Sequence, residues 1–191
     1  PNGHRVAVVG GGPAGLAAAW ELARRGYGVK LYEALPVLGG MLAAGIPAYR
    51  LPKEALQREI GDILALGVEV ETGVRLGRDL WLDDLIGVEY EAVFLGVGAW
   101  KSRPLGVPGE DLPGVVHAIE MLRDVNLATL RGDGVLPQVG ERVAVVGGGN
   151  AAVDAARTAL RLGAREVHIV YRRTRDEMPA LSGEIEEAIR E

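Results

Sequence analysis

Two stretches of this chain share one pattern of apolar and polar positions. Each begins with a short apolar run, passes through a glycine cluster, continues as an Ala/Leu-rich segment with helical periodicity and reaches a second apolar run. The predicted elements are a strand at 5–9, a helix at 14–25 and a strand at 29–32, then a strand at 142–146, a helix at 151–162 and a strand at 167–171. Strand, tight turn, helix and strand form the βαβ unit, so we expect an α/β protein with parallel strands.

The two stretches also begin with the same residues. Arg5–Gly12 and Arg142–Gly149 are identical in sequence, and one glycine, Gly26 or Gly163, follows each predicted helix. Because the segment between the copies is long and unlike either of them, a short-repeat solenoid is excluded. The chain is therefore interpreted as two copies of one opening unit.

The segment between the units is less regular. It predicts a loop at 38–52, a helix at 53–66, strands at 68–71 and 92–97, a Pro/Gly-rich linker at 104–113, a helix at 117–126 and a surface loop at 127–140. A last helix is predicted at 184–191. We expect a domain boundary near Gly114, which gives domains of residues 1–113 and 114–191.

Composition narrows the possible functions. The net charge is −5 without a long basic run, which argues against nucleic acid as a partner. No apolar run reaches the roughly 18 residues of a spanning helix and no signal peptide is visible, so no membrane association and a cytoplasmic location are expected. The 191 residues contain no Cys, which excludes thiol chemistry and Cys-ligated metal or iron–sulfur sites within them. Any redox chemistry would therefore use an organic cofactor.

The first glycine cluster has the spacing of a dinucleotide-binding fingerprint. Gly10, Gly12 and Gly15, with Pro13 and Ala14 between the last two, follow a predicted strand and open a predicted helix. These glycines would allow a tight turn, close approach of backbone to a pyrophosphate, and close helix packing. The alternative is a glycine-rich turn in an unrelated α/β domain, but the complete strand–turn–helix context favours ligand binding.

An acidic residue ends the second strand of this first unit. Glu33 stands where a carboxylate accepts hydrogen bonds from both ribose hydroxyls and repels a 2′-phosphate. A solvated charge at a strand end is the simpler interpretation of Glu33 taken alone. With the fingerprint before it, we expect a dinucleotide that lacks a 2′-phosphate, as in FAD.

The second cluster differs in ways that favour NADPH. Its fingerprint consists of Gly147, Gly149, Asn150, Ala151 and Ala152, with Ala152 in place of the third glycine. Tyr171 falls at the position of the acidic residue, and Arg172 and Arg173 follow it. Two guanidinium groups at this position can bind a ribose 2′-phosphate through charge-assisted contacts. The alternative is an exposed basic strand end, which we consider less favoured.

Several further motifs resemble one family of flavoproteins. They are Gly39-Gly40-Met41, Gly45-Ile46-Pro47, Tyr49-Arg50-Leu51-Pro52, Phe94-Leu95-Gly96-Val97-Gly98, Val107-Pro108-Gly109, Tyr171-Arg172-Arg173 and Glu177-Met178-Pro179-Ala180. Together with the two fingerprints, these motifs resemble the glutamate synthase small subunit family over essentially the whole chain. The resemblance implies two Rossmann-like dinucleotide-binding units in a two-domain FAD/NAD(P)-binding flavoprotein, with the NADPH domain inserted into the FAD domain.

The resemblance also implies an activity and a set of contacts. Hydride would pass from NADPH to FAD, and electrons would pass on to an iron–sulfur domain or subunit outside this chain, such as a glutamate synthase large subunit or ferredoxin. FAD contacts would fall on Gly10–Gly15, Glu33, Gly40, Met41, Arg50 and Leu76, and NADPH contacts on Gly149, Asn150, Ala151, Arg172 and Arg173. No catalytic side chain and no metal ligand are expected, because the cofactors supply the chemistry.

The sequence departs from the family pattern at both ends. A Cys-rich iron–sulfur segment does not precede the first fingerprint, and the returning FAD segment with its Gly-Asp motif is absent. We therefore expect a fragment of a longer protein or one chain of a split one, with both units incomplete. Two alternatives stay open at this point: a thioredoxin-reductase-like enzyme, disfavoured because it needs a Cys pair, and a non-catalytic dinucleotide-binding or interaction module.

Overall fold

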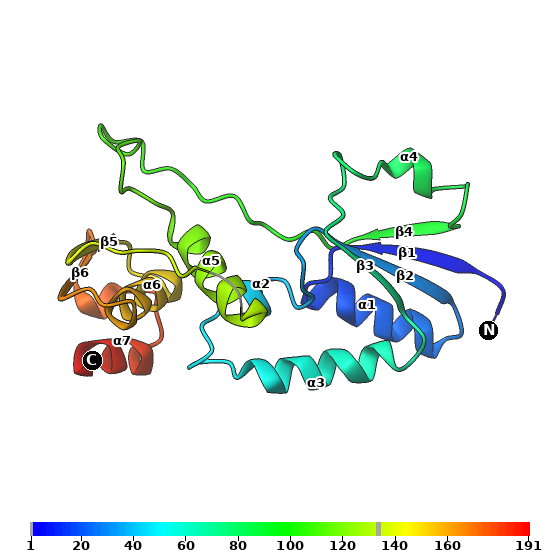
Figure 1. The fold of residues 1–191 in the computed structure, drawn as a ribbon, viewed down its shortest axis with the longest axis horizontal. Helices are drawn as coiled ribbons and strands as arrows, with labels where there is room; N and C mark the ends of the chain where they lie inside the picture. Colours follow the sequence, from blue (N-terminus) through cyan, green and yellow to red (C-terminus); the bar gives the residue numbers. More distant parts are fainter. Residues whose placement is uncertain (1, 133–134) are drawn as a thin grey trace. The chain divides into compact units, whose positions relative to one another are not determined.

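The computed structural model describes residues 2–132 and 135–191 and has the predicted α/β architecture (Figure 1). The chain divides into two compact units, the first made of Pro1–Ala44 and Ala48–Ala99 and the second of Gly45–Pro47 and Trp100–Glu191. The boundary between the two compact units therefore falls after Ala99, upstream of the domain boundary that the sequence predicts near Gly114. The functional domains at 1–113 and 114–191 stay a prediction.

The first unit is built on a parallel sheet with the strand order β3-β2-β1-β4. Its strands are β1 (Arg5–Val9), β2 (Gly28–Glu33), β3 (Glu69–Thr72) and β4 (Ala92–Leu95). Helices α1 (Pro13–Arg24) and α3 (Lys53–Leu64) lie on one side of this sheet, and the short helix α4 (Leu82–Leu85) lies on the other (Figure 1). The strand β1 is therefore central within the sheet and covered on both faces.

Alternation along β1 divides the core of this unit into two layers. Successive strand side chains point to opposite faces, so Ala7 and Val9 share one face. Ala7 and Val9 pack with Tyr32, Leu85 and Tyr90 in one buried cluster. The apolar side chains of α1 contact the sheet from the other side, where α1 packs against β1, β2, β4 and α3.

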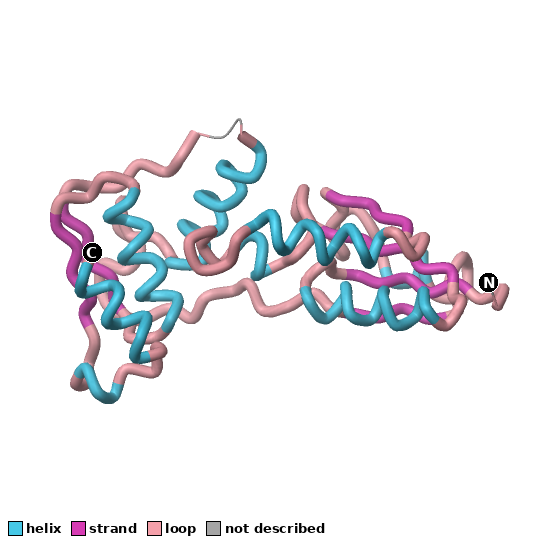
Figure 2. Tube along the Cα trace, turned by 90° about the horizontal axis from the view of Figure 1, so that it is seen from below, coloured by secondary structure: helices cyan, strands magenta, loops and turns pink. Residues whose placement is uncertain are grey.

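The second unit contains a two-stranded parallel sheet and more helix than strand. Its elements are α5 (Ala118–Arg131), β5 (Arg142–Val146), α6 (Asn150–Arg161), β6 (Glu166–Val170), the 3₁₀ turn η1 (Arg175–Glu177) and α7 (Ser182–Arg190). Helix α6 contacts both strands as well as α5 and α7. The strand pair lies along one side of its unit, with helices on the other (Figure 2).

Several element boundaries differ from those expected. The predicted loop at 127–140 is wrong over its first five residues, because the helical pattern continues to Arg131 and ends at Gly132 in the left-handed conformation (φ 69°). The short helices α2 (Met41–Ala44) and α4 were not predicted, since four residues are too few to show a helical period. The other predicted helices and strands occur within two residues of their expected ends.

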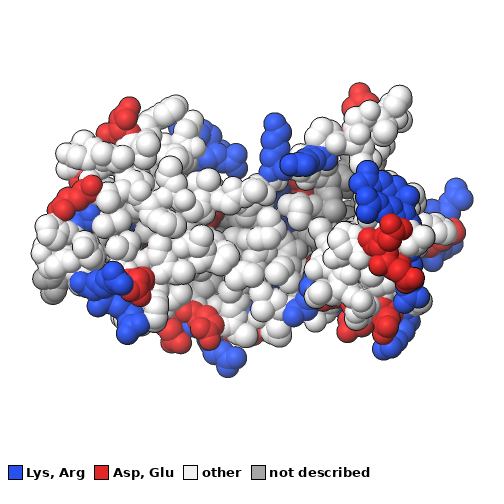
Figure 3. All heavy atoms as spheres, turned by 180° about the vertical axis from the view of Figure 1, so that it is seen from behind, with Lys and Arg blue, Asp and Glu red and all other residues white. Residues whose placement is uncertain are grey.

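Charged side chains of both signs are interspersed on the face shown in Figure 3. Some ion pairs join neighbouring elements, as Lys30 on β2 does with Glu71 on β3 at 2.8 Å. Among the described residues, no helix combines the length and the apolar character needed to cross a membrane.

Candidate dinucleotide sites

The first glycine turn is built by backbone contacts that exclude side chains. Gly10 has a φ of +107°, and a Cβ at this position would overlap the carbonyl oxygen of Gly96. A Cβ at Gly15 would in turn overlap the carbonyl oxygen of Gly10. These glycines therefore allow the tight turn and the close packing of α1 that the fingerprint predicted for its first and third positions, and Gly10 also lets the residues after β4 approach the turn.

The carboxylate of Glu33 is joined to the same turn. Its Oε2 accepts a hydrogen bond of 2.7 Å from the N–H of Gly11, and its Oε1 accepts one of 2.7 Å from the N–H of Leu35. The side chain is buried. Each carboxylate oxygen can accept more than one hydrogen bond, so both keep acceptor capacity for a ribose hydroxyl. The structure thus places Glu33 beside the glycine turn, and its contact with a ribose stays a prediction.

The loop after β2 returns to the glycine turn. The N–H of Gly39 donates to the carbonyl of Gly11 at 2.8 Å, and Gly40 packs so closely on Gly12 that a Cβ would lie 2.7 Å from the Cα of Gly12. Met41 then begins α2. The predicted contacts Gly40 and Met41 are therefore brought together with the fingerprint, although they lie more than twenty residues away in sequence.

Two further predicted FAD contacts have less direct geometry. Arg50 is half-buried in the turn that precedes α3. Leu76 packs against the hydrophobic cluster that contains Tyr32 and Tyr90, which gives its side chain a place in the core. Both residues stay predicted contacts.

Both fingerprint helices begin without a capping side chain. Gly12 precedes α1 and Gly149 precedes α6, and neither helix has a side-chain hydrogen bond at its N-cap. Within the first turns, Pro13, Ala14 and Ala151 are exposed. The first N–H groups of a helix have no partner within the helix and carry partial positive charge. The N-terminus of each helix can therefore donate hydrogen bonds to phosphate oxygens.

The second unit repeats the geometry of the first. Strand β1 pairs with β2 from Arg5 opposite Gly28 onward, and β5 pairs with β6 from Arg142 opposite Glu166 onward. Gly10 donates to the carbonyl of Tyr32 at 2.8 Å, and Gly147 donates to that of Val170 at 2.9 Å. The residue after each acceptor is Glu33 in one unit and Tyr171 in the other.

Tyr171 therefore occupies the position of the acidic residue in the second unit. Its ring lies against Gly148, where a Cβ would come within 2.6 Å of a ring atom. An uncharged side chain thus takes the place of a carboxylate that would repel a 2′-phosphate. Ala152, which replaces the third glycine, is buried. A Cβ at Gly147 would lie 3.2 Å from the Cβ of Ala152.

The basic residues that follow Tyr171 face solvent. Arg172 and Arg173 are exposed, and neither has an ion-pair or hydrogen-bond partner among the residues that the structure describes. Their guanidinium groups are therefore available to an anion. Asn150 differs, because its Oδ1 accepts a 2.9 Å hydrogen bond from the N–H of Leu181. This bond gives Asn150 a structural contact in addition to its predicted one.

Two residues of the first unit were not singled out as site residues. Gly96 donates its N–H to the carbonyl of Val9 at 2.7 Å and packs on Gly15. Its signal in the sequence is the Gly-Val-Gly that follows β4. Lys53 is buried at the start of α3, where its Nζ donates to the carbonyl of Leu42 at 2.9 Å. Burial lowers the pKa of Lys53 to about 8. A lysine before an amphipathic helix carries no sequence signal of burial.

These two glycine turns define a protein class, the α/β oxidoreductases with paired dinucleotide-binding units. Residues 4–191 match the family model of the pyridine nucleotide-disulphide oxidoreductases, and the chain belongs to this family. The predicted cofactors, FAD and NADPH, are confirmed at the level of the family. Since the 191 residues contain no Cys, this segment supplies no thiol to the disulphide chemistry of the family name.

Curated relatives agree with the predicted resemblance. The chain is 51% identical over 189 residues to the NADP(+)-dependent formate dehydrogenase subunit beta of Moorella thermoacetica, with 98% of this chain and 26% of the relative covered. It is 39% identical over 192 residues to the glutamate synthase (NADPH) small chain of Escherichia coli, with 98% and 40% covered. The chain thus spans between about a quarter and two fifths of the length of these relatives.

A solved structure shares the fold. FprA of Mycobacterium tuberculosis in complex with NADPH matches with a TM-score of 0.80 and 25% sequence identity, covering 98% of this chain and 47% of that one. This match supports the α/β fold with Rossmann-like units that the sequence predicts.

Proposed function

We propose that this chain is the FAD- and NADPH-binding part of a flavoprotein oxidoreductase that takes hydride from NADPH and delivers electrons to an iron–sulfur partner. The first unit would hold FAD and the second would hold NADPH. FAD, when bound, supplies the conversion of a two-electron hydride into single electrons. The names of two relatives, a formate dehydrogenase subunit and a glutamate synthase small chain, support a place in a multi-subunit enzyme.

The observation that carries the proposal is the presence of glycine at two positions where the fold does not require it. Gly12 (φ −77°) and Gly149 (φ −89°) have extended backbone that any residue adopts. A Cβ at Gly12 would meet only ordinary contact at 3.7 Å, and one at Gly149 would have no atom of the chain within 4 Å among those described. Both residues precede a helix with no side-chain cap, where Ser, Thr, Asp or Asn would stabilise the helix better. Close approach of a pyrophosphate accounts for glycine at both positions.

The contributions of the chain are binding and orientation. The uncapped N-termini of α1 and α6 would hold the two pyrophosphates, and Glu33 would accept hydrogen bonds from the ribose of FAD. Arg172 and Arg173 would bind the 2′-phosphate that distinguishes NADPH from NADH. This chain need supply no nucleophile or metal ligand for hydride transfer, because the reacting atoms belong to the two cofactors.

The test is reduction of the bound flavin in the full-length protein. Purified protein should show flavin absorbance that NADPH bleaches under anaerobic conditions, and the same concentration of NADH should bleach it much more slowly. Protein that stays colourless after incubation with FAD would contradict the proposal. Nucleotide binding without flavin reduction would favour a non-catalytic dinucleotide-binding module instead.

The electron acceptor is tested separately. A low-potential iron–sulfur protein such as ferredoxin should be reduced by NADPH only in the presence of this protein. Reduction of small artificial acceptors but not of any iron–sulfur partner would leave the NADPH–flavin half of the proposal standing and contradict the partner.

A further inference from the structure

The segment that follows β6 leaves the second glycine turn and comes back to it. We name residues 171–181 the return loop. At its start, the ring of Tyr171 lies against Gly148. At its end, the N–H of Ala180 donates to the carbonyl of Gly148 at 3.1 Å and the N–H of Leu181 donates to Oδ1 of Asn150 at 2.9 Å. The return loop is thus attached to the fingerprint at both ends.

One carboxylate organises the interior of this loop. Oε2 of Glu177 accepts hydrogen bonds from the N–H of Thr174 at 3.1 Å and from its Oγ1 at 3.0 Å. The hydroxyl of Tyr171 donates to the backbone carbonyl of Glu177 at 3.2 Å. The spacing Thr-x-x-Glu is that of a capping box, here on the single turn η1. Glu177 thereby connects Tyr171 and Thr174, the residues on either side of Arg172 and Arg173.

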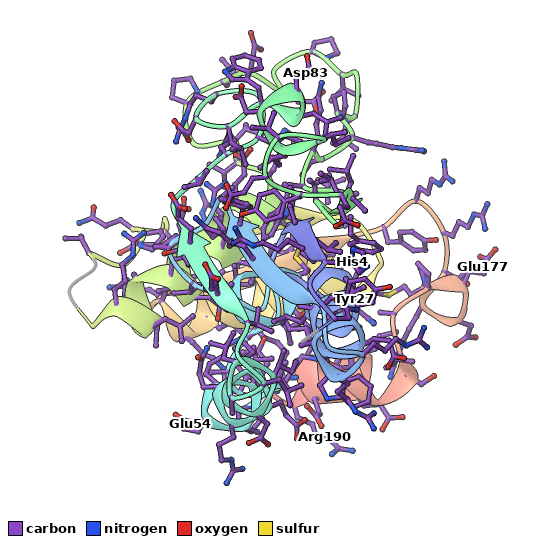
Figure 4. All side chains as sticks on the ribbon, turned by 90° about the vertical axis from the view of Figure 1, so that its right-hand side faces the viewer. His4, Tyr27, Glu54, Asp83, Glu177 and Arg190 are labelled. Carbon is purple, nitrogen blue, oxygen red and sulfur yellow. The ribbon has the colours of Figure 1, made fainter. Side chains whose placement is uncertain are left out.

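Glu177 is exposed on the loop (Figure 4). Among the described residues, it makes no ion pair with Arg172 or Arg173. Its hydrogen bonds therefore restrain the backbone around Arg172 and Arg173 without occupying their guanidinium groups. A restrained backbone loses less entropy when the arginines bind an anion, so it raises affinity without a new contact. Its negative charge acts in the opposite direction, because a carboxylate near a phosphate repels it.

We propose that Glu177 is a positioning residue that sets the preference for a 2′-phosphorylated nucleotide, because its carboxylate holds Thr174, which directly follows Arg172 and Arg173. This inference rests on the proposed function of the two arginines. The positional role and the charge of Glu177 have opposite effects on phosphate affinity, so substitutions can separate them. Loss of the acceptor should weaken binding, whereas loss of the charge alone should not.

The experiment compares Glu177→Ala with Glu177→Gln in the full-length protein, using 2′,5′-ADP and ADP as probes in calorimetric titrations. Glu177→Ala should weaken 2′,5′-ADP about tenfold, because both hydrogen bonds from Thr174 are lost and the loop is less preorganised, and it should leave ADP unchanged. Glu177→Gln keeps an acceptor at the same position and should bind 2′,5′-ADP at least as tightly as the unsubstituted protein. Glu186→Ala removes an exposed acid of α7 that pairs with Arg190, and it serves as the matched control.

The outcomes separate this inference from the proposed function. If the unsubstituted protein binds 2′,5′-ADP and ADP equally, the assignment of the 2′-phosphate site itself is overturned. If the unsubstituted protein prefers 2′,5′-ADP to ADP and the Glu177→Ala variant shows the same preference, only the positioning role is overturned. Tighter binding of 2′,5′-ADP by Glu177→Ala would show that charge outweighs position and would also overturn it. Equal losses of both probes would indicate a general structural defect and count against a specificity role.

Discussion

The N–H of Gly11 donates a 2.7 Å hydrogen bond to Oε2 of Glu33, so the acid that ends β2 is attached directly to the glycine turn that follows β1. The second oxygen of the same carboxylate accepts from the N–H of Leu35. A residue predicted to recognise a ribose therefore also has a structural role. Substitution at this position is expected to change stability as well as cofactor binding.

Glu33→Ala should lower the free energy of unfolding of the cofactor-free protein by about 3 kcal/mol, because two backbone N–H groups lose a charged acceptor in a buried site. It should also abolish retention of flavin through purification. Denaturant unfolding and the flavin absorbance measure the two effects. Glu71→Gln, on the neighbouring strand, removes an acid from a partly exposed ion pair with Lys30 and should change stability by less than about 1 kcal/mol. A Glu33→Ala protein with unchanged stability would contradict the role of these hydrogen bonds.

Gly149→Ala should weaken NADPH binding at least tenfold while changing the free energy of unfolding by no more than about 1 kcal/mol, because the new Cβ meets no described atom of the chain but would meet a pyrophosphate. Titration with NADPH and denaturant unfolding together test this separation. Gly61→Ala is the matched control, since a Cβ at this helical position also has open space around it. It should stabilise the protein by about 0.5–1 kcal/mol and leave NADPH binding unchanged. Equal NADPH affinity in both variants would refute the pyrophosphate site.

Gly15→Ala should behave in the opposite way to Gly149→Ala. A Cβ at Gly15 would overlap the carbonyl oxygen of Gly10, so α1 must move away from the turn. Overpacking of this kind costs about 1–3 kcal/mol, and more where backbone must shift. We expect a clear fall in the unfolding midpoint of the cofactor-free protein, measured by circular dichroism. A midpoint equal to that of the unsubstituted protein would contradict the close approach of α1 to β1.

Replacement of both Arg172 and Arg173 by Ala should weaken NADPH by about 100-fold and NADH by less than about threefold, because only NADPH offers a 2′-phosphate for charge-assisted hydrogen bonds. Steady-state reduction of the flavin with each nucleotide gives the two KM values. Arg165→Ala is the matched control, since Arg165 is an exposed arginine that pairs weakly with Glu141 at 3.4 Å. Equal losses of NADPH and NADH in the double variant would show that the arginines do not recognise the 2′-phosphate.

Lys53 should make stability depend on pH in an alkaline window. Burial lowers its pKa to about 8 in the folded protein, whereas an unfolded lysine has a pKa of about 10.4. Between these values the unfolded chain binds more protons, so the free energy of unfolding should rise with pH, by about 3 kcal/mol over the whole window. The difference between the unfolding curves of the protein and of Lys53→Met isolates this effect from other titrations. Parallel curves for the two proteins would contradict the lowered pKa.

The local structure was predictable from the sequence wherever short-range rules decide it. The identical runs Arg5–Gly12 and Arg142–Gly149 each form a strand and a glycine turn, and both strands pair with the next strand in the same register. The period of apolar residues and the glycine positions determine the strands and turns, because side-chain alternation and allowed φ values act within a few residues, whereas the shared register is seen only in the structure. The same rules identified the fingerprint residues and placed Tyr171 at the position in the second unit that Glu33 has in the first.

Contacts between distant segments could not be predicted in this way. The approach of Gly40 to Gly12, the packing of Gly96 on Gly15 and the burial of Lys53 each depend on how loops return over the sheet. No local pattern encodes such a return, since the contacting groups are mostly backbone atoms without a side-chain signature. The bonds of Glu177 to Thr174 are local, but their significance follows from the attachment of the return loop to Gly148 and Asn150.

The five residues Arg-Val-Ala-Val-Val show where the sequence stops and the tertiary structure decides. As β1 they are the centre of a four-stranded sheet, and Val6 to Val9 are all buried. As β5 they belong to a two-stranded sheet, and exposed positions alternate with half-buried ones, so that Val146 is 58% exposed whereas Val9 is 4% exposed. Sequence alone determined strand and turn in both copies, because these depend on local geometry. Burial depends on what packs against each face, and the structure supplies that packing on both faces of β1 and on one face of β5.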